Sequence, residues 1–471
     1  MSGLLTPDIC VIGAGSGGLS VAAAAAGFGV EVVLVEKGEM GGDCLNTGCV
    51  PSKALIAAAA RAHHVRSSEA FGIAAAEPEI DFAAVRRHVR EVIGAIAPHD
   101  SVERFTGLGV RVIEAEGRFT GPDELRAGDY RIRARRFVIA TGSSPAVPPV
   151  PGLEDVPYLT NETLFDLAER PDHLIIIGGG PIGMEMAQAF RRLGAEVTVL
   201  EMFEPLGVAD PEAAAIVLQR LEAEGVAIRS GVRIARIARD KERIRAELED
   251  GGHVTGSHLL VAAGRAPNVA GLGLDKAGIA HDKRGITVDA GLTTSNRRIY
   301  AIGDVAGAAQ FTHMANYHAG VVIRRALFRL PARVRLDAVP WVTYTDPELA
   351  HVGLDEQAAR RQYGEVEILR QPFAGNDRAI AERRTEGLVK VVIGRRGRIF
   401  GATIVGPHAG EIIQPWVLAI TRKLPIKAMT APIIPYPTLS ELNKRAAISY
   451  YEKTMGNPWL RGAIRFLAKF G

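Results

Sequence analysis

The sequence contains little cysteine, and this scarcity limits what its few thiols can do. Three cysteines in 471 residues cannot form a framework of structural disulfides. Cys44 and Cys49 nevertheless lie close together, and such a pair in a cysteine-poor chain is typical of a redox or metal site. A metal site would require further ligands at short spacing, and His63 and His64 alone are a weak set. The sequence therefore favours redox chemistry at Cys44 and Cys49 and predicts no bound metal.

Long apolar runs and strong charge are also missing. No apolar run approaches the roughly 20 residues that a membrane-spanning helix needs. The opening residues, MSGLLTPDIC, lack the basic stretch and cleavage site of a signal peptide, so we expect a cytoplasmic protein. The formal net charge is +3, and no Lys/Arg cluster is dense enough to indicate nucleic-acid binding. The length predicts several domains.

The strongest pattern in the sequence is an internal duplication. Residues 8–15 and 173–183 each read as a β-branched strand that ends in glycines and runs into a helix. A second strand follows each helix and ends at Glu36 or Glu201, at the same spacing. The two glycine sets are Gly13, Gly15 and Gly18, and Gly178, Gly180 and Gly183. Two GxGxxG patterns between strand and helix, each followed by an acid, indicate two dinucleotide-binding units.

The same physical argument applies to both units. The first glycine permits a tight turn, the second lets the backbone approach a pyrophosphate, and the third lets helix and strand pack closely. The helix N-terminus adds amide donors and positive dipole charge. Glu36 and Glu201 can accept hydrogen bonds from a ribose 2′-hydroxyl, and a carboxylate repels a 2′-phosphate. The second unit is therefore expected to favour NAD over NADP. Glycines that serve packing alone remain the alternative.

Each unit also has a later apolar strand that ends in a turn. These strands lie in residues 136–145 and 258–268, and a third, in residues 297–307, places Asp304 beside a glycine at its tip. One chain thus carries two dinucleotide sites. A flavin in one and a nicotinamide in the other would form an electron relay.

Residues 41–53, GGDCLNTGCVPSK, are the most specific stretch of the chain. With the ATG turn, the second GxGxxG and the Gly-Asp strand, they resemble the flavin-dependent pyridine-nucleotide–disulfide oxidoreductases, closest to dihydrolipoamide dehydrogenase with features of mercuric reductase. The resemblance implies an α/β fold with two Rossmann-like domains for FAD and NAD(P), a C-terminal α+β dimerisation domain, and an obligate homodimer. The expected segments are an FAD-binding domain (1–150), an NAD(P)-binding domain (151–270), a central domain completing the FAD site (271–339), a dimerisation domain (340–450) and a C-terminal tail (451–471).

The resemblance also implies roles for individual residues. Cys44 would exchange with substrate, and Cys49 would lie against the flavin, where the helix that it opens favours its thiolate. Lys53 and Glu185 would form an ion pair beside the flavin ring, and Asp304 would contact the FAD ribityl chain. The predicted cofactor-binding residues are Gly13, Gly15, Gly18, Glu36, Gly42, Lys53, Gly117, Thr141, Gly142, Gly178, Gly180, Gly183, Glu201, Gly264, Asp304 and His313. Cys10 and His318 are expected to be structural.

The chain departs from the family at its catalytic base. The family's His-Pro-Thr-x-x-Glu motif reads PYPTLSE at residues 435–441, which places Tyr436 at the histidine position. A phenol with a pKa near 10 cannot easily act as a base at neutral pH. Glu441, which would orient the histidine, is then expected to hydrogen-bond the phenol. Tyrosine at this position resembles mercuric reductase, but the terminal cysteine pair of that enzyme is missing here.

Three functions remain open from the sequence. The first is an NAD-linked, FAD-dependent thiol–disulfide oxidoreductase that acts on a small dithiol or lipoyl-bearing protein through Cys44 and Cys49. The second is a mercuric-reductase-like reductase of a metal ion or other soft electrophile. The third is a flavoprotein that serves as a scaffold in a larger complex. The reaction direction depends on redox poise rather than on sequence.

The last residues carry a separate pattern. Arg461, Arg465 and Lys469 are spaced four apart and fall on one helical face, while most of the remaining side chains are apolar. Such a tail can lie on an anionic membrane surface. Packing on the protein's own surface is the alternative.

Overall fold

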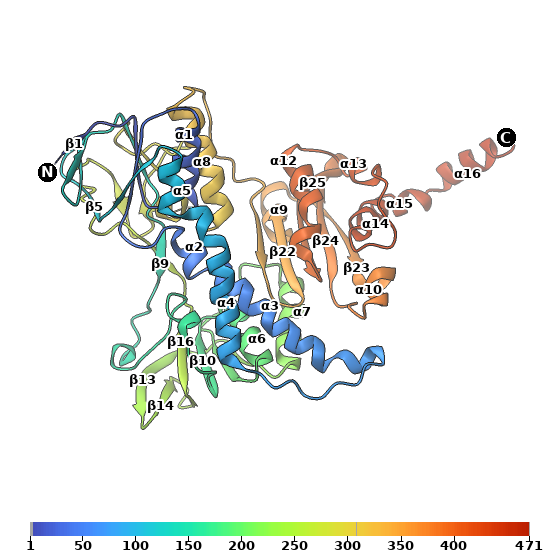
Figure 1. Ribbon diagram of the computed structural model, residues 1–471. Helices are drawn as coiled ribbons and strands as arrows, with labels where there is room; N and C mark the ends of the chain where they lie inside the picture. Colours follow the sequence, from blue (N-terminus) through green and yellow to red (C-terminus); the bar gives the residue numbers. More distant parts are fainter. Residues whose placement is uncertain (1–2, 308, 471) are drawn as a thin grey trace. The chain divides into compact units, whose positions relative to one another are not determined.

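The computed structural model describes residues 3–307 and 309–470, which form two compact units (Figure 1). Unit 1 comprises residues 1–202 and 231–334, and unit 2 comprises residues 203–230 and 335–471. Residues 203–230 thus group with the C-terminal part of the chain, although the sequence division assigns them to the second nucleotide-binding domain. The five-segment division itself stays a prediction.

The first nucleotide-binding unit is built on a parallel sheet in the order β20-β8-β2-β3-β4. Its strands are β2 (Ile9–Ile12), β3 (Val32–Glu36), β4 (Arg111–Glu114), β8 (Arg136–Ile139) and β20 (Ile299–Ala301). Side chains along each strand alternate between two cores. Ile9 and Val11 face a core that includes α1 (Ser16–Gly27) and α8 (Thr312–Ala326), and Cys10 and Ile12 face the other. Cys10 is fully buried, as expected of a core residue.

The duplication predicted from the sequence has the same backbone form in both copies. In the second copy, β10 (His173–Ile177) pairs in parallel with β11 (Glu196–Leu200) and β16 (His258–Val261), and α6 (Pro181–Arg192) follows β10. Gly13 and Gly178 have φ values of 105° and 110°, which only glycine adopts readily. A Cβ on Gly18 or Gly183 would lie 1.9 or 2.0 Å from the carbonyl oxygen of the first glycine, so both positions require glycine.

The remaining elements of unit 1 cover and connect these two sheets. α3 packs against α4, and α1 lies beside α8 (Figure 1). The helices are α2 (Gly42–Asn46), α3 (Cys49–Arg66), α4 (Phe82–Ile96) and α5 (Val102–Gly107). β1 (Leu4–Leu5) pairs in parallel with β7 (Tyr130–Ile132). The antiparallel pairs of unit 1 are formed by β5 (Gly117–Phe119), β6 (Leu125–Ala127), β7, β9 (Ser143–Pro145), β13 (Ile234–Asp240), β14 (Arg243–Leu248), β15 (His253–Gly256), β17 (Arg265–Pro267), β18 (His281–Asp282) and β19 (Gly285–Ile286).

Unit 2 is an α+β structure around an antiparallel sheet in the order β21-β22-β25-β24-β23. Trp416 is fully buried in its core, and its indole nitrogen donates to Asn443 Oδ1 at 2.7 Å. The strands are β21 (Pro340–Thr343), β22 (Glu348–Gly353), β23 (Glu367–Pro372), β24 (Leu388–Gly394) and β25 (Arg398–Gly406). The helices are α7 (Pro211–Ala223), α9 (Glu356–Tyr363), α10 (Asp377–Ala381), α11 (Ala409–Ile412), α12 (Gln414–Thr421), α13 (Lys427–Thr430), α14 (Glu441–Ser449), α15 (Glu452–Met455) and α16 (Pro458–Leu467).

The predicted fold class is confirmed: two strand–helix–strand nucleotide-binding units are followed by a C-terminal α+β unit. Among the described residues, no helix combines the length and apolar character that spanning a bilayer requires.

Candidate redox site

Two short helix starts position the cysteine pair. Gly41, with φ of 89°, precedes α2, which carries Cys44, and Cys49 is the first residue of α3. The Asn46 side chain donates to the carbonyl oxygens of Met40 and Gly42, both at 3.0 Å, and so fixes the turn between them. Cys49 Sγ therefore lies at the N-terminal end of α3, where amide donors favour a thiolate.

The two thiols have opposite acidities. Hydrogen bonding from the Cys44 thiol lowers the pKa of Cys49 to about 6, and the Thr312 hydroxyl and the Lys53 charge add to this against the effect of burial. Cys49 Sγ lies 3.3 Å from Thr312 Oγ1. The same hydrogen bond, together with burial, raises the pKa of Cys44. As residues, Cys49 is solvent-exposed and Cys44 is half-buried.

This asymmetry predicts a pH dependence of alkylation. In the reduced protein without bound FAD, iodoacetamide should modify Cys49 with a midpoint near pH 6, because the lowered pKa keeps the reactive thiolate populated above that pH. Cys44 should stay unmodified through neutral pH, because its pKa is raised. Mass spectrometry of peptides alkylated across a pH series would measure both.

Cys44→Ala supplies the matched variant for that measurement. It removes the largest cause of the lowered pKa, so the Cys49 midpoint should move upward. A midpoint near the ordinary thiol value in the unmodified chain would contradict the assigned electrostatics.

Lys53 and Glu185 form the ion pair that the resemblance implies. Lys53 Nζ on α3 donates to Glu185 Oε2 on α6 at 2.8 Å. The Glu185 side chain is 6% exposed, so its charge requires this partner. The pair places a cation one turn along α3 from Cys49. Its position beside a flavin ring stays a prediction.

The first glycine cradle, formed by Gly13, Gly15 and Gly18 at the start of α1, fits a dinucleotide. A Cβ on Gly15 would meet nothing within 4 Å, so the backbone there is open to a ligand. Gly42 packs so closely on this glycine that a Cβ would lie 2.8 Å from Gly15 Cα, which brings the redox loop against the cradle. Glu36 Oε2 accepts from Ala14 N at 2.5 Å, and its Oε1 accepts from Gly38 N at 2.7 Å. These contacts fix the carboxylate at the edge of the cradle.

The second cradle repeats this arrangement. Gly180 also has open space around a hypothetical Cβ, and Glu201 Oε2 accepts from Gly179 N at 2.6 Å. The next residues, Met202, Phe203 and Glu204, supply no cation for a 2′-phosphate. This donor set suits NAD.

A polar network that sequence reasoning missed joins the redox loop to Asp304. Arg265 Nη2 lies 3.2 Å from Asp43 Oδ2, and Arg265 Nε donates to Ser143 Oγ at 2.7 Å. Ser143 in turn donates to Asp304 Oδ2 at 2.6 Å. Burial raises the pKa of Asp304, and the serine and arginine partly oppose this. The only sequence signals were the position of Asp43 beside Cys44 and that of Arg265 beside Gly264.

The other predicted cofactor residues of unit 1 mark turns or core positions. Thr141 Oγ1 donates to the Asn268 carbonyl oxygen at 2.9 Å, which ties two turns together. Gly142 and Gly264 have positive φ values, of 68° and 123°. Gly117 is buried in β5. Two further predicted positions, His313 and His318, lie on α8 and differ from each other: His313 is exposed and stacked on Phe311, whereas His318 is buried and its Nδ1 accepts from Gly303 N at 3.1 Å.

Tyr436 and Glu441 lie in unit 2, and the expected bond between them is wrong. The Tyr436 hydroxyl donates to Asp377 Oδ2 at 2.8 Å, whereas Glu441 Oε1 accepts from Arg445 at 3.0 and 3.1 Å. The reason is local: positions four apart on α14 are neighbours, so Glu441 meets Arg445. The Asp377 hydrogen bond and charge raise the pKa of Tyr436, which makes the phenol still less suited to act as a base.

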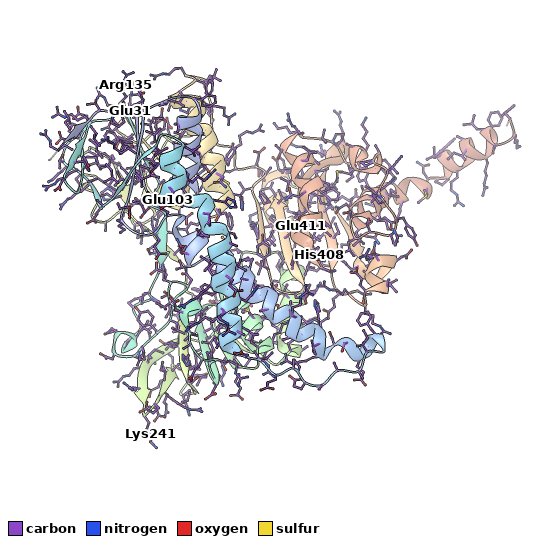
Figure 2. All side chains as sticks on the ribbon, viewed as in Figure 1. Glu31, Glu103, Arg135, Lys241, His408 and Glu411 are labelled. Atoms are coloured by element: carbon purple, nitrogen blue, oxygen red, sulfur yellow. The ribbon has the colours of Figure 1, made fainter. Side chains whose placement is uncertain are left out.

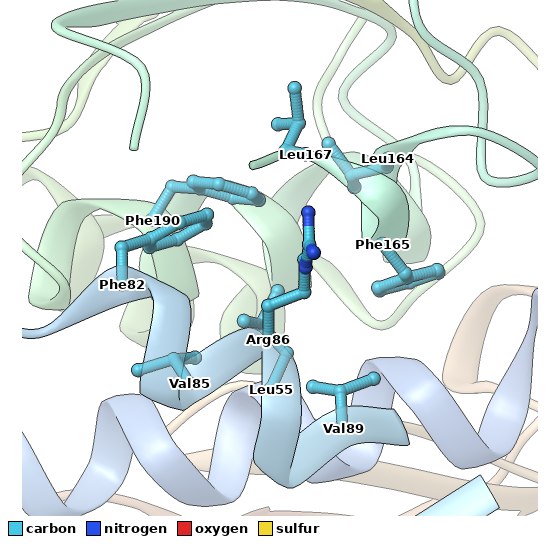
Figure 3. Close-up of a pocket in the computed structure, with 9 residues that line it drawn as sticks. All are labelled: Leu55, Phe82, Val85, Arg86, Val89, Leu164, Phe165, Leu167 and Phe190. Atoms are coloured by element: carbon cyan, nitrogen blue, oxygen red, sulfur yellow. The ribbon is translucent and has the colours of Figure 1, made fainter. Parts of the chain in front are cut away.

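A small apolar cavity elsewhere in unit 1 is not a second reaction site. Figure 3 shows Arg86 among apolar side chains, and its Nη1 donates to the Asp166 carbonyl oxygen at 3.5 Å. The cavity holds about 10 Å³, room for roughly one water. It is lined by Leu55, Phe82, Val85, Arg86, Val89, Leu164, Phe165, Leu167 and Phe190.

Two nucleotide cradles and a cysteine pair on adjoining elements define a nicotinamide- and flavin-linked disulfide reductase. Comparison with known proteins agrees. Residues 7–319 match the family described as pyridine nucleotide-disulphide oxidoreductase, and residues 339–447 match the dimerisation domain of that family. The chain belongs to the pyridine nucleotide-disulphide oxidoreductases and is therefore an enzyme that uses FAD and NAD(P). The dimerisation domain supports a homodimer.

Relatives with different names are about equally similar. A dihydrolipoyl dehydrogenase of Thermus scotoductus is 37% identical over 470 residues, which cover 96% of this chain and 98% of the relative. A mercuric reductase of Streptomyces lividans is 36% identical over 455 residues, covering 94% and 96%.

The similar solved structures are also flavoprotein reductases or their relatives. The Cu(II) complex of the HOCl-induced flavoprotein disulfide reductase RclA from Escherichia coli matches with a TM-score of 0.85 and 28% identity, over 93% of this chain and 98% of that one. LpdA from Mycobacterium tuberculosis matches with a TM-score of 0.87 and 27% identity, over 95% and 99%. These comparisons show the family and leave the substrate open.

Proposed function

We propose that the chain is an NAD-linked thiol–disulfide oxidoreductase that acts on a dithiol or disulfide through Cys44 and Cys49. The observation that carries the proposal is the acidic Cys49 beside the less acidic Cys44, with Lys53 one turn along the same helix. A thiolate is the nucleophile and the leaving group in disulfide exchange, so unequal acidity assigns different tasks to the two sulfurs.

In the oxidising direction, a substrate thiolate attacks Cys44 Sγ of the Cys44–Cys49 disulfide. A mixed disulfide forms, and Cys49 leaves as the thiolate that the helix N-terminus, Thr312 and Lys53 stabilise. The second substrate sulfur then attacks the first, which closes the substrate disulfide and releases Cys44. FAD held at the cradle of Gly13, Gly15 and Gly18 would supply an acceptor for the electron pair of the cysteines and hydride chemistry toward the nicotinamide.

Tyr436 narrows the substrate class. The Tyr436 hydroxyl donates a hydrogen bond to Asp377, and its pKa is raised. The phenol therefore cannot take the proton of an ordinary thiol at neutral pH. A substrate whose own thiol is acidic needs no base, because it attacks or leaves as the thiolate. We therefore propose acidic thiols, or disulfides made from them, as better substrates than dihydrolipoamide.

Tyr436→His tests this proposal. The variant should raise kcat/KM for dihydrolipoamide at neutral pH by about 10²-fold, the lower range for a positioned base. It should leave NADH-dependent reduction of an aromatic disulfide with an acidic thiol unchanged. Tyr436→Phe is the control, since it removes the Asp377 hydrogen bond without adding a base and should give no gain. If steady-state kinetics show no gain in kcat/KM for dihydrolipoamide in the histidine variant, Tyr436 does not determine the preference for acidic thiols.

Reduction of a soft metal ion is the second candidate function. Paired thiolates are suitable ligands for such ions, and Tyr436 is compatible with a reaction that needs no thiol deprotonation by a base. Mercuric reductases are among the relatives, and RclA forms a Cu(II) complex. NADH oxidation that depends on added Hg²⁺ or Cu²⁺, and not on dithiol or disulfide, would favour this candidate over the first.

A further inference from the structure

The C-terminal helix α16 exposes an apolar face that nothing in the described chain covers. It begins at Pro458, where Asn457 caps it by accepting from Trp459 N at 3.0 Å and from Leu460 N at 3.4 Å. Trp459 is 89% exposed and Leu467 is 66% exposed. Every described side chain of α16 is exposed. A capped helix with a solvent-exposed tryptophan on an apolar face is typical of a surface that binds a partner.

The side chains of the helix separate by chemistry. Leu460, Ile464 and Leu467 follow the spacing of three and four that places residues on one face. Trp459 and Phe466 extend this face, and Phe466 packs edge-to-face on Phe470 with ring centroids 5.0 Å apart. Arg461 and Arg465 share the opposite face, and Lys469 follows one turn later. The helix is therefore strongly amphipathic.

Charge identifies the partner. Residues 457–470 contain three cations, Arg461, Arg465 and Lys469, and no Asp or Glu. Lys453 is paired with Glu367 at 2.9 Å and so belongs to the folded unit, not to this surface. A cationic face beside an apolar, aromatic-rich face complements a surface that is anionic at its headgroups and apolar just below them. We infer that residues 457–470 dock the enzyme on the surface of an anionic lipid bilayer.

The lipid test compares variants of the full-length holoprotein by co-sedimentation with large unilamellar vesicles. The unmodified protein should sediment with phosphatidylcholine vesicles that contain phosphatidylglycerol, and much less with pure phosphatidylcholine. Each cation near an anionic membrane surface contributes roughly fivefold to binding, so the triple variant R461Q/R465Q/K469Q should bind the anionic vesicles on the order of 100-fold more weakly. W459S/F466S should also bind weakly, because the apolar face supplies the rest of the affinity. Raising the salt concentration should weaken binding.

A matched control removes the same charge elsewhere. R239Q/K241Q/R243Q neutralises three exposed cations of the β13–β14 hairpin, at whose tip Figure 2 labels Lys241. This variant should bind anionic vesicles like the unmodified protein. If both triple variants lose binding equally, general net charge explains the result and the docking inference falls.

Two further outcomes would also overturn the inference. One is equal vesicle binding by the full chain and by a chain that stops after Gly456. The other is dissociation of the dimer on that truncation without any vesicle binding by the full chain, which would identify a second copy as the partner. NADH oxidation with a soluble acceptor should be unchanged in every variant, because none touches the cradles or the cysteines. A failure of docking is thus separable from a failure of the proposed reaction.

Discussion

Replacing Cys49 with serine should reduce dithiol-dependent reduction of NAD⁺ by roughly 10³-fold or more, the scale on which removing an enzyme's nucleophile acts. Serine cannot leave as a stable anion near neutral pH, whereas Cys49 has its pKa lowered to about 6. Cys44→Ser should cause a loss of the same order, because the substrate disulfide cannot form without the exchanging sulfur. Steady-state NADH production with a dithiol measures both variants.

The two variants should differ in one spectroscopic property. NADH reduction of the unmodified holoprotein should reduce the Cys44–Cys49 disulfide and produce long-wavelength absorbance from the thiolate facing the oxidised flavin. Cys44→Ser has no disulfide to reduce, so its band should be present before NADH is added, whereas Cys49→Ser should show no band at any stage. The reversed pattern would exchange the roles assigned to the two sulfurs.

Cys10 provides the matched control for the cysteine variants. It is a buried thiol on β2, and burial raises its pKa. Cys10→Ala should therefore lose some stability and keep full turnover. NADH-dependent reduction of ferricyanide, which accepts electrons without a disulfide, should survive in all three variants and show that both cofactor sites are intact. Dithiol turnover that survives in either serine variant would refute the relay and favour a scaffold role.

The sequence predicts those parts of the site whose residues lie close together along the chain. Gly13, Gly18 and Glu36 lie within one strand–helix–strand unit, and sterics alone dictate the first two positions. The same holds for Cys44 and Cys49, because turn glycines and a helix start fix their surroundings.

The parts that sequence does not predict depend on contacts between distant segments. Arg265 joins Asp43 to Ser143, and neither partner is marked by local spacing. Tyr436 meets Asp377 across 59 positions, while Glu441 takes the nearer partner on its own helix. Motif reasoning misassigned the hydrogen bond of Tyr436, because side-chain pairing is decided by packing that the motif does not encode.

The clearest case of such long-range pairing is a buried charge cluster in unit 2. The ammonium of Lys390 on β24 lies 2.7 Å from Asp210 Oδ2, 3.1 Å from Glu356 and 3.2 Å from Glu212. The Lys390 and Asp210 side chains are only 5% and 3% exposed. Asp210 also caps α7 by accepting from the backbone nitrogens of Glu212 and Ala213. Burial alone would lower the pKa of Lys390, but its hydrogen bonds to these acids raise it.

This cluster predicts a large loss of stability from Lys390→Met. The shape of the side chain is kept, but Asp210 is left as a buried carboxylate without its cation, which costs about 3 to 5 kcal/mol. A hollow of about 490 Å³ beside the cluster admits water to the partly exposed Glu212 and Glu356, so the lower end, about 3 kcal/mol, is expected. All three tryptophans of the chain lie in residues 335–471, so urea unfolding followed by their fluorescence reports on unit 2.

Two comparisons separate a buried pair from an ordinary ion pair. Lys453→Met removes an exposed lysine bound to Glu367 and should cost less than about 1 kcal/mol. Adding Asp210→Asn to Lys390→Met should restore most of the loss, because asparagine also caps helices and leaves no unpaired charge at that position. Equal losses in the free energy of unfolding for Lys390→Met and Lys453→Met would mean that water screens the charges of the buried cluster as it screens an exposed ion pair. Unit 2 would then be held by its apolar core around Trp416 rather than by the pairing of Lys390 with α7.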